Sequence, residues 1–477
     1  MKGNLLKSAL ALLIALSAVF AGAACVFLRP AEQSAVITEA PDVSEAVTEA
    51  PSAGPTSAPA PPPTGEPTAA PTGEDTPEPI TEEPTPAPTA PPTEKPTPAP
   101  TPAPTPKPTK EPTPKPTKTP KPTGSHTAKP SATPGPAFDP SDVTMMFVGD
   151  LMCLSGQQYA AMNQAGSGAD YDFRPSFDYV KSILSRADIA MGNLETTLSG
   201  SWPYATEEKE IDGMPNCNGP AEFLQAVKYA GFDALALANN HCCDAGVTGI
   251  LETLDAVDQY GLKHTGLFRT ESESRYKILN VGGIKVGLLS YAEFYNHKES
   301  CVYEAGCPFM INTYSESTAR RDIAAAKAAG AEFIIVYEHW GREHTHEPTE
   351  LQLKHARQLA NAGADLICGS HSHTVQPSVW LEADDGRRVL CAYSLGNFVS
   401  SMSQSASNDT VIMELRIGRS GGRTVIKNET YHPCRVIRQV GGKCFVVVPT
   451  SETSIPSIRA ELEAAEERIM RILMSKR

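Results

Sequence analysis

Residues 349–373, "TELQLKHARQLANAGADLICGSHSH", change hydrophobic period within one short stretch. The first part has apolar residues at the spacing of an amphipathic helix, and "ADLIC" is a short apolar run typical of a buried strand. His371 and His373 follow where that run ends. A helix that leads into a buried strand is the repeating unit of an α/β layered domain.

The same alternation recurs through the chain after residue 140. Apolar runs predict buried strands over 143–150, 188–195, 232–241 and 331–341, and amphipathic patterns predict helices over 175–187, 219–231 and 316–330. Two further pieces, 276–293 and 377–397, have the pattern of antiparallel hairpins. We therefore expect two packed sheets with helices outside them.

Composition divides the chain into four parts. Residues 31–140 are dense in Pro, Thr and Ala, which denies the backbone donors that helices and sheets need and predicts a disordered, extended linker. Residues 141–450 have ordinary globular composition and the length of one large domain. Residues 451–477 predict a C-terminal amphipathic helix. The linker is expected to act as a stalk or as a simple tether.

Residues 1–30 resemble an export segment, with Lys2 and Lys7 ahead of an apolar stretch. Three processing routes stay open: an uncleaved anchor, lipidation at Cys25, or cleavage after an Ala-x-Ala such as 21–23. All three place the bulk of the chain outside the cytoplasm. A retained anchor or a lipid would hold it on the outer face of a bacterial cell membrane. In an oxidising compartment Cys301 and Cys307 are candidates for a disulfide. The formal net charge of −14 argues against nucleic acid as a partner.

Polar residues that bind metals occur where the predicted strands end. Because the carboxyl ends of strands in an open α/β sheet face one crevice, residues far apart in sequence are expected to meet there. Carboxylates, an amide oxygen and imidazoles are ligands for a hard or borderline divalent cation. The residues concerned are Asp150, Glu195, Asn240, His241, His339, His371 and His373.

Each of these residues also has a structural explanation. Asp150 could cap a turn, Asn240 could take a left-handed conformation, His339 could be a core residue beside Trp340, and Glu195 could pair with a lysine. It is less economical to assume that every one of these strands ends in a metal-binding residue type by chance. His344, His346 and His355 are assigned to a polar loop or a helix and not to the site.

At these positions the chain resembles the CapA family of poly-gamma-glutamate capsule biosynthesis proteins, which in turn resembles calcineurin-like metallophosphoesterases. The resemblance implies a four-layer α/β/β/α sandwich over about residues 143–400. Six motifs carry it in order: "FVGDLM" at 147–152, "GNLETTLSG" at 192–200, "ALANNHCCDAG" at 236–246, "YEHWGREHTHEPTELQ" at 337–352, "CGSHSHTVQP" at 368–377 and "YSLGNF" at 393–398.

The resemblance also implies a role for each matching residue. Asp150 and His373 would bind one divalent metal, Asn240, His339 and His371 a second, and Glu195 would bridge them. His241 and Asp244 take catalytic roles. Substrate contacts are expected from Asn193, Asn239, Arg342 and Asn397. One position departs from the pattern, because Met152 stands where the phosphoesterases usually have a histidine ligand.

Three functions follow from the motifs. The first is a cell-surface protein of poly-gamma-glutamate capsule biosynthesis or export, with one or two divalent ions (Mn, Fe, Zn or Mg) and with the membrane, capsule synthesis and export proteins and the polymer as partners. The second is an exported phosphoesterase acting on cell-envelope phosphoesters, in which two metals would polarise a phosphoryl oxygen. The third is a non-catalytic module that grips an anionic polymer through its metal. Because the chain is acidic, contact with polyglutamate needs a metal or a Lys/Arg cluster.

Overall fold

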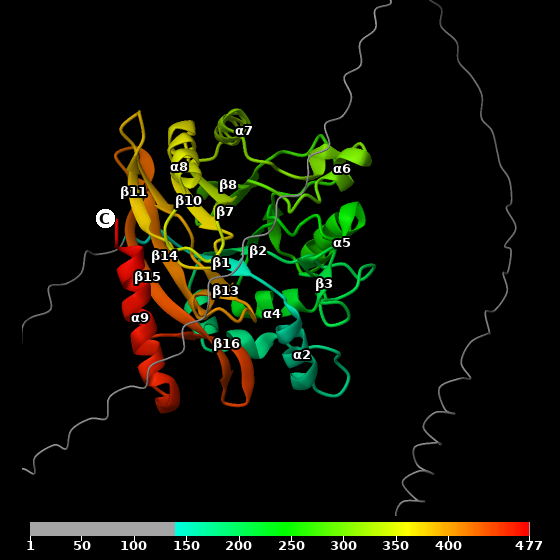
Figure 1. The fold of residues 1–477 in the computed structure, drawn as a ribbon. Coiled ribbons are helices and arrows are strands. Elements are labelled where there is room, and N and C mark those ends of the chain that lie inside the picture. The colour runs from blue at the N-terminus through cyan, green and yellow to red at the C-terminus, as the bar shows by residue number, and fades with distance from the viewer. Residues whose placement is uncertain (1–138, 477) are drawn as a thin grey trace, which may run out of the picture. The chain divides into compact units, whose positions relative to one another are not determined.

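The computed structural model describes residues 139–476. The expectations for residues 1–30 and for almost all of the linker lie outside them. The described part contains two large sheets, a short hairpin and helices on the outer faces of the sheets (Figure 1). None of the helices within 139–476 combines the length and the apolarity needed to cross a bilayer.

The first sheet has eight strands and is parallel in its central part. Its order is β16-β15-β14-β1-β2-β5-β6, with β13 paired beside the end of β1. The strands β1, β2, β5 and β6 run parallel, and β14, β15 and β16 extend the sheet antiparallel. The bounds are β1 (Val143–Leu151), β2 (Ile189–Leu194), β5 (Ala234–Ala236), β6 (Lys263–Thr265), β13 (Asn397–Val399), β14 (Asp409–Ser420), β15 (Arg423–Val440) and β16 (Lys443–Pro449).

The second sheet has six strands in the order β11-β12-β10-β9-β8-β7. Its centre is parallel, and the outer pairs β7–β8 and β11–β12 are antiparallel, as the two predicted hairpins require. The bounds are β7 (Lys277–Val281), β8 (Ile284–Ala292), β9 (Phe333–His339), β10 (Leu366–Ser370), β11 (Ser378–Glu382) and β12 (Arg388–Ala392). A separate small hairpin joins β3 (Glu210–Ile211) to β4 (Met214–Pro215).

Helices cover the outer face of each sheet. Below the first sheet lie α2 (Ser155–Gln164), α3 (Lys181–Leu184), α4 (Phe223–Ala230) and α5 (Gly246–Gln259). Above the second sheet lie α7 (Glu316–Ala328) and α8 (Glu350–Ala362), while α9 (Arg459–Leu473) runs along β14 and β15 (Figure 1). The short elements are α6 (Ser300–Glu304), η1 (Arg174–Phe177), η2 (Pro308–Met310), η3 (Ser405–Asn408) and η4 (Pro456–Ile458).

Three apolar layers hold these elements together. One fills the space between the sheets with side chains such as Phe147, Val286 and Ile335, a second packs α4 and α5 under the first sheet, and a third packs α7 and α8 on the second sheet. Helix, sheet, sheet and helix therefore form four layers, and the predicted α/β/β/α sandwich is confirmed. Burial of these layers is the main stabilising contribution.

One predicted helix is not continuous. Residues 175–187 form η1 and the single-turn α3, with Asp178 at the break. The Asp178 carboxylate accepts hydrogen bonds from the Tyr229 hydroxyl at 2.9 Å and from the Lys443 ammonium. Tertiary contacts at the break thus override the local helical pattern.

Two glycines allow the sheets to meet beside the predicted site. A Cβ on Gly149 would lie 1.9 Å from the carbonyl oxygen of Gly396, and one on Gly369 would lie 1.9 Å from that of Tyr393. No side chain fits at either position. The close approach brings the end of β1 next to β13 and the end of β10 next to the residues that follow β12.

Candidate metal centre

The predicted ligands come together at the carboxyl ends of five strands from both sheets. Asp150 is in β1, Glu195 follows β2, Asn240 follows β5, His339 ends β9, and His371 and His373 follow β10. The backbone N–H of His371 donates to Oδ2 of Asp150 at 3.2 Å, although the two residues are 221 positions apart. The crevice that the strand pattern predicts is therefore a single site.

Glu195 lies at the middle of this site and belongs to two candidate ligand groups. Its Oε1 is 3.5 Å from Nε2 of His339, and its Oε2 is 3.8 Å from Nδ1 of His373. One group joins Glu195 with His371 and His373, the other joins it with Asp150 and His339, and in each the ligand atoms lie within 4.8 Å of one another. A carboxylate shared by two groups has the position of a bridging ligand.

The burial of Glu195 tests whether a cation fits here. The side chain is completely buried, and neither carboxylate oxygen has a hydrogen-bond partner among the described residues. Nδ1 of the buried His371 also lacks one. A buried carboxylate without donors is strongly unfavourable unless a cation compensates it. These orphaned acceptors, with their carboxylate, imidazole and amide neighbours, fit a divalent metal ion.

Burial also sets the protonation of the candidate ligands. It raises the pKa of Asp150 to about 7, and burial together with the charge of Asp150 raises the pKa of Glu195 well above its ordinary value. Burial and the neighbouring imidazoles lower the pKa values of His339 and His371, and burial lowers that of His373 to about 3. The imidazoles are thus neutral at pH 7, the form that binds a metal.

Hydrogen bonds from three further side chains orient these ligands. Asn193 Nδ2 donates to Oδ1 of Asp150 at 2.8 Å, Ser370 Oγ lies 3.0 Å from Nδ1 of His339, and Asn397 Oδ1 lies 2.8 Å from Nδ1 of His373. Such outer partners fix ring orientation and tautomer at metal sites.

The other predicted ligand, Asn240, directs its side-chain oxygen at His339. Oδ1 of Asn240 lies 2.8 Å from Nε2 of that ring. The same amide donates through Nδ2 to Asn296 at 3.3 Å. Asn240 therefore stands within the cluster, on the side where His339 and Glu195 face each other.

His371 and His373 both adopt left-handed backbone conformations. The φ angles of His371 and His373 are 83° and 54°, and their rings lie 5.9 Å apart at an interplanar angle of 52°. Non-glycine residues in this region carry strain that the surrounding structure must hold, and such strain concentrates at functional sites. The turn after β10 brings a ring nitrogen of each histidine within 4.8 Å of a Glu195 oxygen.

His241 and Asp244 form a pair at the edge of the cluster. Nδ1 of His241 lies 2.7 Å from Oδ2 of Asp244, whose Oδ1 lies 3.6 Å from the Lys298 ammonium. Burial alone would lower the pKa of His241, but the Cys217 thiol and the Asp244 carboxylate raise it well above its ordinary value. The catalytic assignment of the pair stays a prediction.

The four residues expected to contact substrate divide by exposure. Asn193, Asn239 and Asn397 are buried, and their amides bind neighbours: Asn239 donates to the carbonyl of Leu194 at 2.7 Å. Arg342 is exposed in the loop after β9. Their contact with a substrate stays a prediction. Met152, at the departure from the phosphoesterase pattern, is buried.

Sequence reasoning missed two residues at the site. Cys217 forms a third candidate group with His241 and Asp244, and Glu343 Oε1 lies 4.0 Å from Nε2 of His373. Cys217 follows the small β3–β4 hairpin in a stretch without periodicity, so no pattern distinguished it. Glu343 lies beside Arg342 in the segment "HWGREH". Its carboxylate, so close to His339 in sequence, could have indicated that it belongs to the site.

The cysteines remain thiols in this structure. All ten in the described residues are free, so the Cys301–Cys307 disulfide is not present. A hydrogen bond with the Cys243 thiol instead raises the pKa of the Cys301 thiol. This contact connects α6 to the segment that carries His241 and Asp244.

Known capsule biosynthesis proteins are similar to this chain over more than half of its length. The family model described as "Bacterial capsule synthesis protein PGA_cap" matches residues 144–402. The PGA biosynthesis protein CapA of Bacillus subtilis is 29% identical over 283 residues, which are 58% of this chain and 68% of that protein. The capsule biosynthesis protein CapA of Bacillus anthracis is 29% identical over 287 residues, 58% and 65% of the two chains. The alignments thus span about two thirds of these relatives.

Among solved structures, the calcineurin-like phosphoesterase YfkN from Bacillus subtilis matches 69% of this chain and 98% of its own, at 14% identity and a TM-score of 0.37. A match this weak carries no argument about the site. The family match covers more than half of the chain and includes every residue of the cluster. The chain belongs to the bacterial capsule synthesis family PGA_cap.

Proposed function

We propose that this protein acts in the biosynthesis or export of a poly-gamma-glutamate capsule on the outer face of the bacterial membrane, through a centre that holds one or two divalent cations. Glu195 carries the proposal: its two buried, unpartnered oxygens stand between two sets of ligands in a chain of a capsule synthesis family. The apolar segment at residues 1–30 supports the location at the membrane.

Asp150, His339, His371, His373 and Glu195 would hold the cations. When bound there, a divalent cation supplies Lewis-acid polarisation of a substrate oxygen. The neutral imidazoles and the carboxylates would be its ligands, and their burial keeps them fixed. The partners that we propose are the polymer and the proteins that make or export it.

The second candidate is an exported phosphoesterase, which the pair His241 and Asp244 favours. Asp244 orients the ring through Nδ1, as is needed for a histidine that exchanges a proton with a leaving group. The identity of the metal does not distinguish the two candidate functions, because the same ligand types suit Mn, Fe, Zn and Mg. The two functions differ in their substrate, so the substrate distinguishes them.

A complementation experiment tests the first proposal. The gene is removed from its host, and surface polyglutamate is measured after return of the wild type, His371→Ala or the exposed-site control Arg320→Gln. We expect polymer with the wild type and the control, and a strong reduction with His371→Ala. Full polymer with His371→Ala would contradict the proposal. Metal-dependent hydrolysis of bis(p-nitrophenyl) phosphate by the purified chain, with unchanged polymer in the deletion strain, would favour the phosphoesterase.

A further inference from the structure

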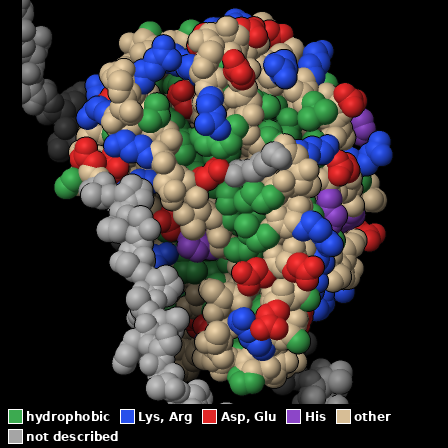
Figure 2. Space-filling model, turned by 90° about the vertical axis from the view of Figure 1, so that its left-hand side faces the viewer, with side chains coloured by type: hydrophobic (Ala, Val, Ile, Leu, Met, Phe, Trp, Pro, Cys, Tyr) green, Lys and Arg blue, Asp and Glu red, His purple; other side chains and the backbone are tan. Residues whose placement is uncertain are grey.

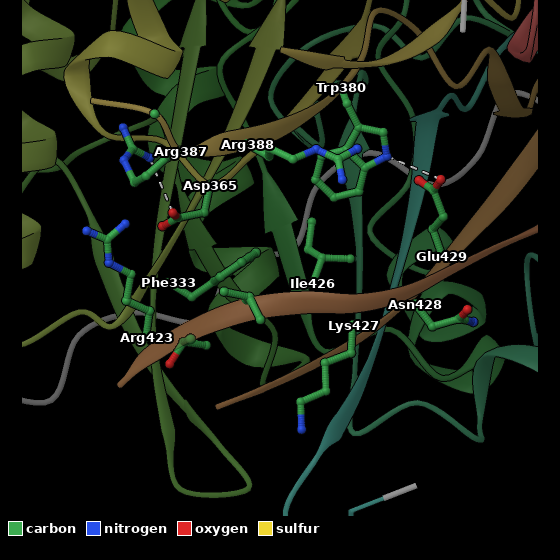
Figure 3. Close-up of a pocket in the computed structure, with 13 residues that line it drawn as sticks. Phe333, Asp365, Trp380, Arg387, Arg388, Arg423, Ile426, Lys427, Asn428 and Glu429 are labelled. Atoms are coloured by element: carbon green, nitrogen blue, oxygen red, sulfur yellow. Dashed lines mark hydrogen bonds and ion pairs between the residues drawn. The ribbon is translucent and has the colours of Figure 1, made fainter. Parts of the chain in front are cut away.

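A cavity of about 600 Å³ lies at the opposite end of the strands from the metal centre. Its wall includes Phe333 at the start of β9, while His339 of the metal centre ends the same strand. At about 3.3 Å per strand residue, the two sites are roughly 20 Å apart. Residues from β11, from the turn before β12 and from β15 complete the wall (Figure 3).

The lining is basic in a chain that is acidic. The residues that line the cavity include four basic and two acidic ones: Arg387, Arg388, Arg423 and Lys427, with Asp365 and Glu429. The whole chain has a formal net charge of −14. The face that carries β11, β15 and α9 presents both basic and acidic side chains around apolar ones (Figure 2). A positive lining against this background favours an anionic occupant.

Two of the four basic groups are engaged within the fold. Arg387 donates to the carbonyls of Ala360 and Ala364 at the end of α8, each at 2.7 Å, and pairs with Asp385. The Lys427 ammonium pairs with Asp142 just before β1. These groups shape the cavity and are already neutralised in part.

Arg388 and Arg423 are the basic groups left for a ligand. Neither forms a salt bridge with any residue of 139–476, and both are exposed. The Arg388 guanidinium lies 4.5 Å from the ring centre of Trp380, whose indole N–H donates to Glu429 at 3.3 Å. Trp380 is thus held in place, and it holds the Arg388 guanidinium over its ring. Figure 3 shows Arg423 at the other end of the cavity, near Arg387.

The cavity continues into a second one of about 360 Å³. The two share Asp365, Arg387, Arg423 and Thr424, and the second adds Lys327 and Arg419 among its basic residues. Arg419 is paired with Glu332 at 2.8 Å. The result is a groove with separate cationic points along it, floored by apolar side chains such as Phe333 and Ile426.

We propose that this groove binds a segment of a polycarboxylate chain, the class to which poly-gamma-glutamate belongs. Cationic points on different strands suit carboxylates repeated along a polymer better than one small anion, and the apolar floor suits the methylene groups between them. The proposal rests on the proposed function for the nature of the polymer. It places polymer binding away from the metal centre, so that one chain is held at one end while the centre acts at the other.

Calorimetric titration of the full chain with a γ-linked glutamate decamer tests the groove, with the uncharged amide form of the decamer as a control probe. We expect Arg388→Gln and Arg423→Gln each to weaken binding about tenfold, the loss of one charge-assisted contact. Arg388→Lys, which keeps the charge, should bind more tightly than Arg388→Gln. Arg320→Gln removes the same charge from the exposed face of α7 and should bind as the wild type does. Melting temperatures check that each variant is folded.

Several outcomes would overturn the groove. They are unchanged affinity in both Gln variants, equal binding of the amide decamer, full competition by inorganic phosphate, and equal binding of an inorganic polyphosphate of the same length. Binding that disappears with EDTA or in His371→Ala would assign the decamer to the metal centre instead. Because the groove should bind with EDTA present, its failure is distinct from failure of the proposed function, which complementation measures.

Discussion

The backbone N–H of His371 donates to the Asp150 carboxylate across the space between the two sheets, at 3.2 Å. Asp150 belongs to the first sheet, and His371 follows the last residue of β10 in the second. This hydrogen bond connects the two sheets at the metal centre. A change in how the sheets pack is therefore expected to alter the centre, even when no ligand is replaced.

Replacing either histidine of the turn should remove metal and leave the fold. We expect His371→Ala and His373→Ala each to lower the bound divalent metal of the purified chain, measured by elemental analysis, because each ring belongs to the group around Glu195. Both histidines already carry a Cβ at a positive φ, so alanine adds no backbone cost and the fold should remain.

His344→Ala is the matched control, because it removes a histidine from the same kind of backbone position. His344 has a φ of 58° and lies outside the candidate ligand groups of the described residues. It should keep its metal, and its stability should change little. Wild-type metal content in both His371→Ala and His373→Ala would show that the pair is structural.

His241→Ala should behave differently from the ligand variants. Its ring is held by Asp244 at 2.7 Å and belongs to neither group around Glu195, so metal content should stay at the wild-type level. Loss of a proton-transfer group should lower turnover by about 10²–10⁴-fold. Elemental analysis and a rate assay on the same sample decide this, and a parallel loss of metal would make His241 a ligand.

Replacing the central carboxylate should separate its metal role from its effect on the fold. Without metal, Glu195→Gln should be more stable than the wild type by about 1–3 kcal/mol, because it removes a buried acidic group that has no donors. With a divalent ion added, the wild type should gain melting temperature and the variant should gain little. A variant that is less stable than the metal-free wild type would show that Glu195 is satisfied without a cation.

Much of this centre could be predicted because its ligands follow apolar strands. Asp150, His339 and His371 stand where a period-two or continuous apolar run stops, and strand ends in layered α/β folds face one crevice. Cys217 follows no such run, and its place beside His241 depends on how the small β3–β4 hairpin lies. Sequence alone does not report such a contact.

The roles of the Asn193 and Asn397 amides could not be predicted from the sequence. In sequence, Asn193 and Asn397 are polar residues within apolar segments, a pattern that fits substrate contact and ligand support equally. The register places them on either side of Asp150, since Asp150 pairs with Asn193 on β2 and with Asn397 on β13. The parallel β1–β13 pair joins segments that no local pattern connects.

The buried His355 should make stability depend on pH. Burial, with a smaller contribution from Lys354, lowers its pKa to about 4, against about 6.5 in the unfolded chain. Between these values the unfolded state binds more protons, so the stabilising neutral form is present above pH 6.5 and its contribution is lost as pH falls toward 4.

His355→Phe should flatten that dependence while keeping the ring contact with Tyr314, whose ring centre lies 4.0 Å away. Urea unfolding at pH 7 and pH 5 measures it: the wild type should lose about 1–2 kcal/mol more than the variant over this interval. Equal losses would mean that His355 is already protonated in the folded chain at pH 5.

A chain that begins at Ser141 should fold by itself. The start of the described domain is tied to the first sheet by Asp142, whose carboxylate lies near Arg416 and binds the Lys427 ammonium, and β1 follows at once. We therefore expect the shortened chain to be soluble, to unfold cooperatively in urea and to bind the same amount of metal as the full chain.

Asp142→Ala in the shortened chain is a useful companion, because it removes the contacts of Asp142 with Arg416 and Lys427 and should lower stability without affecting metal content. Aggregation of the shortened chain, with recovery when residues 100–140 are restored, would move the boundary of the domain into the segment rich in proline.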